Sequence, residues 1–470
     1  MLSTINSWPT TLQLADHASS ELVCEQSLRH LAGKRLTCRG TWNDRKVLIK
    51  LFLHPQSSER HWQREKQGVS LLIDNQLNTP ALLFSGALDD ATPVLIFDYL
   101  PAAQTALEQW ESFDTDQQRL HFLKKLMETV AQQHQCGIWQ NDLHLENFLI
   151  SDEVIYSIDG DDIQQQGQEE DGLSRAKRRD NLALLLAQLP PQCESLFLAA
   201  LAHYGQQSTE QSVEDWATII DNELPQRRKK RRANYVQKSF RSCSEFLRNN
   251  SFNHISIFRR DIDPDLLAAL QAGPDKLMAG GTMLKDGNSA TVVAVEVASK
   301  RWVIKRYNIK NWWHALKRCW RPTRAWTSWG NAHRLSISHI NTPQPVAMIE
   351  KRFGPLRFGG YYICAEVVAP NACEYLLDLQ VNPANKKTVQ EEFVSFFTVL
   401  IQLKISHGDL KGTNFLIKDN EVWVIDLDAM SEFRSQRRFL SRFQQDRARF
   451  LRNWGECSEL KQWFDDHLPL

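Results

Sequence analysis

Residues 140–163 read QNDLHLENFLISDEVIYSIDGDDI, and residues 407–430 read HGDLKGTNFLIKDNEVWVIDLDAM. The two stretches share a skeleton of Asp, Asn and Asp. In both, the Asn follows the first Asp by five residues, and the second Asp follows the Asn by twelve. The members are Asp142, Asn147 and Asp159 in the first copy, and Asp409, Asn414 and Asp426 in the second. Three polar positions repeated at one register indicate that the chain contains two copies of one unit.

The apolar runs around this skeleton predict how the polar groups are held. Residues 148–150 and 154–158 have the pattern of two short strands joined by a polar turn at 151–153. Such a hairpin would keep the three polar groups at one end. Phosphoryl transfer requires a carboxylate facing the acceptor hydroxyl and oxygen ligands for Mg²⁺. Asp, Asn and Asp supply that set.

Both stretches resemble the catalytic loop and metal-binding segment of the protein-kinase superfamily, H-R-D-x-x-x-x-N followed by D-F-G. The resemblance implies that Asp142 and Asp409 are catalytic bases. It implies Mg²⁺ ligands at Asn147, Asp159, Asn414 and Asp426. Gln-Asn and His-Gly stand where His-Arg is usual, while Asp-Gly-Asp and Asp-Leu-Asp replace Asp-Phe-Gly. In these departures the chain looks more like the bacterial lipopolysaccharide core (heptose/Kdo) kinases, with two copies fused.

This resemblance implies an α+β fold of two tandem protein-kinase-like domains, each with a small, mainly β N-lobe and a mainly α C-lobe. A chain of 470 residues has room for two or three domains. We expect a first domain over residues 1–235, a basic linker region over 236–250 and a second domain over 251–470.

A lysine follows an apolar run in the first part of each copy. Lys50 ends the run 47–49, where a lysine is costly to bury unless it faces an anion; a solvated edge lysine is the alternative. The resemblance assigns Lys50 and Lys305 to the lysine that pairs with the ATP phosphates. It assigns Glu65, in a helical stretch, as the partner of Lys50, although a solvated glutamate is an equal alternative. When residues 340–343 (INTP) are aligned with residues 77–80 (LNTP), the position of Glu65 in the first copy corresponds to Trp329, or a residue beside it, in the second copy.

Glycine turns and supporting aspartates complete the expected site. Gly287 lies in a small polar turn whose backbone N–H groups suit phosphate, whereas the first copy offers only Gly40 in the matching region. Asp180 and Asp446 follow the metal-binding segments at similar distances. The resemblance predicts that both are buried and support the catalytic loop; a helix cap is the alternative for Asp180.

Six consecutive cations form the most basic stretch: Arg227, Arg228, Lys229, Lys230, Arg231 and Arg232. Phosphorylated lipopolysaccharide core oligosaccharide, a lipid-linked sugar or the anionic inner face of a membrane would match this charge. A solvated linker explains it equally well. Nucleic acid is not expected as a partner, because the rest of the chain shows no nucleic-acid-binding pattern.

The composition of the chain indicates the cellular compartment in which we expect the protein. Lys plus Arg and Asp plus Glu both number 56, so no net charge selects a partner. The nine cysteines are scattered without a C-x-x-C pair, which favours reduced thiols over a disulfide frame or a zinc site. The first 20 residues lack the pattern of a signal peptide, and no apolar run is long enough to span a bilayer. We therefore expect a cytoplasmic protein, with any membrane contact peripheral.

The resulting hypothesis is an ATP- and Mg²⁺-dependent kinase that phosphorylates a sugar hydroxyl, with a heptose of the lipopolysaccharide inner core as the expected acceptor. Glu65 and the longer C-terminal part favour the first copy for catalysis, whereas His407 and the glycine turn favour the second. Two alternatives remain. One is a pseudokinase scaffold for core assembly, and the other is a protein or small-molecule kinase.

Overall fold

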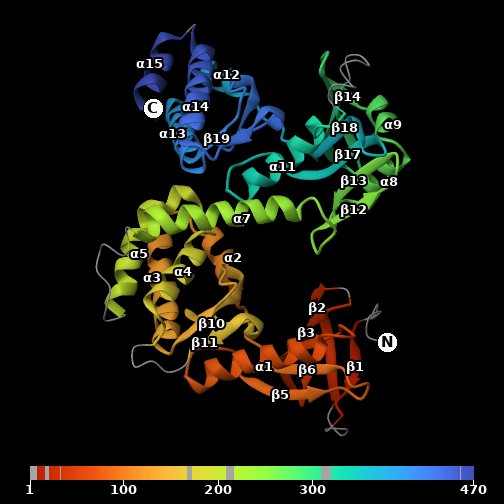
Figure 1. Ribbon diagram of the computed structural model, residues 1–470, viewed down its shortest axis with the longest axis vertical. Helices are drawn as coiled ribbons and strands as arrows, with labels where there is room; N and C mark the ends of the chain where they lie inside the picture. The colour runs from red at the N-terminus through yellow and green to blue at the C-terminus, as the bar shows by residue number, and fades with distance from the viewer. Residues whose placement is uncertain are drawn as a thin grey trace. The chain divides into compact units, whose positions relative to one another are not determined.

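The computed structural model describes residues 8–15, 21–31, 33–166, 172–207, 216, 218–308, 319–455 and 457–470. The chain is mixed α/β and divides into two compact units (Figure 1). The first unit comprises residues 1–189 and 193–227, and the second comprises 190–192 and 228–470. The division falls within helix α7 (Leu224–Lys238). The region expected to be a linker, 236–250, contains the end of α7 and strand β12 (Phe246–Asn250).

The first unit begins with a six-stranded antiparallel sheet of order β1-β2-β3-β4-β6-β5. Its strands are β1 (Thr10–Gln13), β2 (Glu21–Leu31), β3 (Arg35–Trp42), β4 (Arg45–Phe52), β5 (Leu82–Ala87) and β6 (Pro93–Asp98). Strands β3 and β4 form a hairpin, and β4 contains the apolar run that precedes Lys50. Asn43 and Asp44 form the two-residue turn of this hairpin with positive φ, as the right-handed twist of a hairpin requires. Helix α1 (Ser58–Asp74) packs against this sheet.

The rest of the first unit is mainly helical. It contains α2 (Ala106–Glu111), α3 (Asp116–Gln135), α4 (Arg175–Leu186), α5 (Glu194–Gln207), and the strands β7 (Gln104–Thr105), β8 (Ile138–Gln140), β9 (Phe148–Ser151), β10 (Val154–Ser157) and β11 (Ile163–Gln165). Thr115 and Gln118 form a capping box that starts α3. Leu123, Met127 and Val130 form its buried face, as their helical spacing allows.

The second unit is built around a seven-stranded antiparallel sheet of order β12-β13-β17-β18-β16-β15-β14. Its remaining strands are β13 (His254–Arg259), β14 (Thr282–Asp286), β15 (Ala290–Val297), β16 (Lys300–Tyr307), β17 (Pro345–Phe353) and β18 (Leu356–Ala365). Helices α8 (Pro264–Ala272), α9 (Pro274–Ala279) and α11 (Arg324–Ser336) accompany it. Trp329 is fully buried in this unit, so it packs in the core.

Four further helices of the second unit surround its short strands: α12 (Ala372–Leu377), α13 (Pro383–Leu403), α14 (Gln436–Leu451) and α15 (Ser458–His467). Figure 1 shows α13, α14 and α15 grouped near the C-terminus. Phe393, Phe450 and Phe464 join these three helices through ring contacts at 4.9–5.8 Å between centroids. This aromatic core supports the strands β19 (Ile405–Ser406), β20 (Phe415–Lys418), β21 (Glu421–Val424) and β22 (Ser431–Glu432).

The two copies of the motif adopt the same local structure. Strands β9 and β10 form one hairpin, and β20 and β21 form the other, as predicted. In the first unit Ser157 N donates to Asn78 O, and in the second Val424 N donates to Asn341 O, both at 2.8 Å. The aspartate that follows each hairpin has left-handed backbone dihedrals. The sequence repeat is therefore a structural repeat.

Candidate functional site

In the first unit, Lys50 and Glu65 are brought together as predicted. Lys50 lies on β4 and Glu65 on α1, and the Lys50 Nζ pairs with the Glu65 Oε1. Glu65 is fully buried, and its Oε2 also accepts the backbone N–H of Asp161 at 3.3 Å. Helix α1 approaches this segment closely because Gly68 and Gly160 face each other. A Cβ on Gly68 would lie 2.0 Å from the Gly160 oxygen.

A further cation, Arg35, lies close to Glu65 and Asp159, and the sequence did not predict this contact. Arg35 is the first residue of β3, and its Nη1 lies 3.2 Å from Asp159 Oδ1 and 3.7 Å from Glu65 Oε2. Burial alone would raise the pKa of the Asp159 carboxyl, but Lys50 and Arg35 outweigh burial and lower that pKa to about 2. The carboxylate predicted to hold Mg²⁺ is therefore already neutralised by an arginine of its own unit.

Among the predicted catalytic-loop residues of the first unit, Asp142 is more exposed than Lys50 and Glu65. The side chain of Asp142 is 71% exposed, with His144 Nε2 at 3.8 Å from its Oδ2. The Asn147 Nδ2 donates to the Asp142 carbonyl at 2.9 Å, and the Ile158 N–H donates to the Asn147 carbonyl at 2.9 Å. The Asp142, Asn147 and Asp159 segments are therefore joined through the backbone, as the motif spacing predicts.

In the second unit, Lys305 pairs directly with the predicted metal ligand. Its Nζ contacts Asp426 Oδ1 and lies 3.9 Å from Asp428 Oδ2. Burial alone would lower the pKa of the Lys305 ammonium, but Tyr307 and the carboxylates of Asp426 and Asp428 together outweigh burial and raise it. Burial alone would raise the pKa of Asp426, and the pairing with Lys305 lowers it instead. Lysine and aspartate thus stabilise each other's charged forms.

The residue opposite Lys305 explains this different pairing. Ser328 and Glu65 both lie twelve residues before the matching Ile340 and Leu77. Ser328 is buried, and its Oγ bonds the Tyr307 hydroxyl at 2.6 Å. Because no carboxylate stands at this position, Lys305 pairs with Asp426. Ser328 is a residue beside Trp329, so it falls within the position expected from the INTP and LNTP alignment.

Hydrogen bonds fix the loop of the second unit that contains Asp409 and Asn414. The Asp409 N–H donates to His407 Nδ1 at 3.3 Å, and the His407 Nε2 donates to Ile425 O at 3.1 Å. Burial lowers the pKa of His407, so the ring is neutral, as these two bonds require. The Asn414 Nδ2 donates to Asp409 O at 2.8 Å, and the Ile425 N–H donates to Asn414 O at 2.9 Å.

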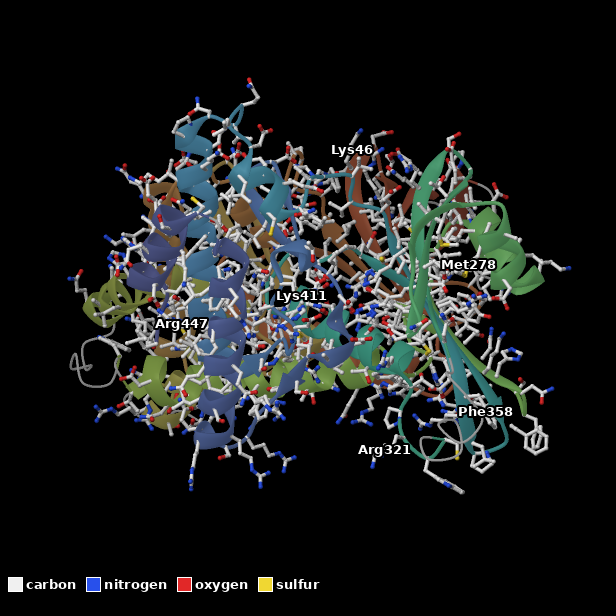
Figure 2. The ribbon with its side chains drawn as sticks, turned by 90° about the horizontal axis from the view of Figure 1, so that it is seen from above. Lys46, Met278, Arg321, Phe358, Lys411 and Arg447 are labelled. Carbon is white, nitrogen blue, oxygen red and sulfur yellow. The ribbon has the colours of Figure 1, made fainter. Side chains whose placement is uncertain are left out.

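Asp409 itself is 25% exposed and sits between two cations. Arg449 Nη1 lies 3.0 Å from its Oδ1, and Lys411 Nζ lies 3.4 Å from its Oδ2. Lys411, labelled in Figure 2, lies between the helices and the sheet of the second unit. Two cations hold the Asp409 carboxylate at the edge of the loop, whereas Asp142 in the first unit points into solvent.

One cavity of about 990 Å³ joins the predicted residues of the second unit. It is lined by Lys305 from β16, by Asp409 and Asn414 from the loop, and by Asp426. Val367 and Val368, which follow β18, line it on another side. The volume falls within the range of small-molecule sites. The cavity therefore brings one lysine, two carboxylates and one amide to a common space.

The glycine positions differ between the copies. Gly287 follows β14, and its N–H donates to Ala290 O at 3.1 Å, so it belongs to the β14–β15 turn. Lys285, near the end of β14, and Ser289, in the turn, line the cavity. In the first unit the corresponding β2–β3 turn contains Gly33, with φ +67°. The predicted Gly40 instead lies within β3, where a Cβ would be 2.0 Å from Val23 O, so its role is close strand packing.

The predicted supporting aspartate is present in only one unit. Asp446 is buried and accepts Gly408 N–H at 3.0 Å and Ser406 Oγ–H at 2.7 Å. Asp180 is half-exposed and pairs with Arg227. Its neighbour Asn181 is buried instead, and its Nδ2 donates to the Gln140 carbonyl at 2.7 Å. The prediction that Asp180 is buried and supports the loop was therefore wrong, and the buried residue that contacts the loop is the next one, Asn181.

The basic run at 227–232 is part of α7, and its side chains point in different directions. Arg228 and Arg232 are buried, and Arg232 Nη2 lies 2.6 Å from Glu432 Oε1. Arg231 Nη1 donates to Ile337 O at 3.3 Å. Lys229 and Lys230 are exposed. The run is therefore not one continuous surface for an anionic partner.

The donor set of the second unit suits Mg²⁺ bound together with a nucleotide. Mg²⁺ prefers oxygen ligands and is held by one or two carboxylates plus substrate phosphates. In the part of the chain that the structure describes, no group of three or more His, Cys, Asp or Glu side chains is arranged for a metal. Asn414 and Asp426 line one cavity, and the Asn414 Nδ2 is already engaged. The Asn414 Oδ1 and the Asp426 carboxylate therefore fit as two ligands, with phosphates supplying the rest.

Comparison of the chain with protein-family models and with curated proteins found no match. Within the described ranges, no helix has the length and apolar character needed to cross a membrane. Conclusions on function therefore depend on the geometry above.

Proposed function

We propose that this chain is an ATP-dependent phosphotransferase built of two tandem protein-kinase-like domains, and that the second unit carries out the reaction. The observation that supports this proposal most is the single cavity lined by Lys305, Asp409, Asn414 and Asp426. A lysine for phosphates, a carboxylate for the acceptor hydroxyl and two oxygen ligands for Mg²⁺ are the parts that phosphoryl transfer needs. The sequence favoured the first copy slightly, and the cavity shifts the proposal to the second.

In this proposal each residue has a separate task. The acceptor hydroxyl oxygen attacks the γ-phosphorus, its proton passes to the Asp409 carboxylate, and the bond from the γ-phosphorus to the bridging oxygen of ADP breaks. Lys305 neutralises nucleotide phosphates. Asn414 and Asp426 would hold Mg²⁺, which offsets the negative charge of the transferred phosphoryl group. The apolar residues Val367 and Val368 offer a surface for the adenine ring.

The first unit has a different role in this proposal. Asp159 is paired with Arg35 much as Asp426 is paired with Lys305, so this pairing does not separate the two units. Asp142, however, is exposed to solvent without a cation comparable to Arg449. This exposure favours a non-catalytic, supporting domain, which retains part of the scaffold hypothesis. The proposed acceptor is a sugar hydroxyl, with a heptose of the lipopolysaccharide inner core as the specific candidate. The protein would then act at the cytoplasmic side of the inner membrane.

The proposal predicts a missing phosphate in cells that lack this protein. Mass spectrometry of their core oligosaccharide should show a species lighter by one phosphate, because the proposed reaction adds that phosphate. The wild-type chain should restore the phosphate, and the Asp409→Asn chain should not. An unchanged phosphate content in the deletion strain would contradict the proposed acceptor.

A further inference from the structure

Helix α14 and the turn after it carry a stripe of arginines beside the proposed catalytic loop. Arg438, Arg442, Arg449 and Arg452 are spaced by four, seven and three residues, which places them on one face of a helix. The only acidic residue of α14, Asp446, is buried and accepts the Gly408 N–H. The exposed face of α14 therefore has a strong positive charge.

Three of these arginines line a second cavity, of about 600 Å³. They are Arg442, Arg449 and Arg452. Gln445, Ser406, Gly408 and Ala448 also line it, together with Asp446, whose carboxylate is buried and already accepts hydrogen bonds from Ser406 and Gly408. Arg442 Nη1 donates to Gln445 Oε1 at 3.2 Å. Among the described residues, no ion pair is recorded for Arg442 or Arg452. Two guanidinium groups are thus available for an anion, and guanidinium forks match phosphate and carboxylate oxygens.

Arg449 connects this cavity to the proposed reaction centre. Its Nη1 lies 3.0 Å from Asp409 Oδ1 and 3.3 Å from the Gly408 carbonyl. Asp409 lines the larger cavity, whereas Gly408 lines the smaller one. An acceptor that offers its hydroxyl to Asp409 would therefore lie next to the arginine-lined cavity.

We propose that Arg442, Arg449 and Arg452 bind an anionic group of the acceptor, a phosphate or a carboxylate, while the acceptor hydroxyl faces Asp409. This inference rests on the proposed function and specifies the acceptor as a molecule that is already negatively charged. The two exposed arginines, Arg442 and Arg452, select the acceptor. Arg449 couples the bound anion to the position of the Asp409 carboxylate.

Direct anion binding tests this proposal independently of turnover. Inorganic phosphate and acetate are titrated into the full chain by calorimetry, with and without Mg²⁺·ADP to fill the nucleotide site. We expect a phosphate or acetate site that remains when Mg²⁺·ADP is present. In the double variant Arg442→Gln/Arg452→Gln, the affinity for the anion should fall at least about tenfold, as expected for the loss of charge-assisted hydrogen bonds. The preferred anion distinguishes a phosphate from a carboxylate on the acceptor.

Matched variants separate local recognition from general charge. Arg437→Gln removes an exposed cation of the same helix that does not line the cavity, and it should leave anion binding unchanged. Arg442→Lys/Arg452→Lys keeps the charge and should restore part of the binding. Equal weakening by Arg437→Gln, or no phosphate or acetate binding by the wild-type chain, would overturn the proposal.

Two further outcomes distinguish this proposal from its alternatives. If the wild-type chain binds phosphatidylserine vesicles through Arg442 and Arg452 but binds neither small anion, the stripe is a membrane surface and the acceptor proposal is wrong. Mg²⁺·ADP binding with no arginine-dependent anion site would refute only this inference. Anion binding without any Mg²⁺·ADP binding would support the anion site and refute the proposed phosphotransferase instead.

Discussion

Asp409→Asn is expected to lower the rate of ATP-dependent phosphoryl transfer by about 10² to 10⁴-fold, the usual contribution of a general base. The amide keeps the size of the side chain but cannot accept the hydroxyl proton. It also loses the ion pairs with Arg449 and Lys411. Single-turnover transfer of radioactive phosphate to core oligosaccharide would measure this loss directly.

Asp142→Asn is the matched control for that experiment, because Asp142 occupies the same position in the first copy. It is mostly exposed and pairs only at 3.8 Å with His144 among the described residues. We expect little change in the transfer rate. Loss of transfer with Asp142→Asn alone would assign catalysis to the first unit. Unchanged transfer in the double variant Asp142→Ala/Asp409→Ala would show that neither aspartate is the base.

Glu65→Ala is expected to destabilise the first unit by about 3–5 kcal/mol, the usual cost of removing one partner of a buried ion pair. The Glu65 carboxylate is fully buried and pairs with Lys50, with Arg35 at 3.7 Å. Its removal leaves a buried ammonium group without its partner and takes one acceptor from the Asp161 N–H. Urea denaturation of the full chain, monitored by tryptophan fluorescence, would show an unfolding transition at a lower urea concentration.

Glu59→Ala provides the control on the same helix. Glu59 is exposed in the first turn of α1 and accepts only a hydrogen bond from Gln63 at 3.0 Å among the described residues. A surface substitution of this kind changes stability by about 0.5 kcal/mol or less. If Glu65→Ala and Glu59→Ala shift the transition equally, the buried pair does not contribute as described.

The sequence predicted those parts of the site that depend on short-range patterns. The repeated spacing located both copies of the motif and the hairpin within each, because strand alternation and turn chemistry determine such elements locally. The Lys50–Glu65 pair was also predicted. This prediction came from the resemblance of the chain to kinases, because residue spacing alone does not identify the pair.

The parts that sequence analysis missed depend on long-range packing. Arg35 reaches Asp159 because β3 pairs with β4 in a register that places Arg35 opposite Phe52, and no local pattern reveals that register. Asn181 replaces Asp180 because an amide can both donate to the Gln140 carbonyl and accept from another group, whereas a carboxylate only accepts.

Helical periodicity could have corrected the interpretation of the basic run. Arg228 and Arg232 are four residues apart, on the same face as Leu224, which is fully buried. Residues four apart on a helix share their environment, so consecutive cations cannot all face one partner. The exposed charge beside the proposed site lies on α14 instead, where the arginines recur at helical spacing.

Mg²⁺-dependent nucleotide binding by two matched variants tests whether the cavity of the second unit holds Mg²⁺·ATP through Lys305, Asn414 and Asp426. The wild-type chain should bind Mg²⁺·ATP in calorimetric titrations and lose it when EDTA removes the metal. Asp426→Asn should weaken binding at least about tenfold, because one charged contact is lost, whereas Asp159→Asn should leave it unchanged. Absence of binding at millimolar nucleotide, or binding that depends on Asp159 and not on Asp426, would contradict the claim.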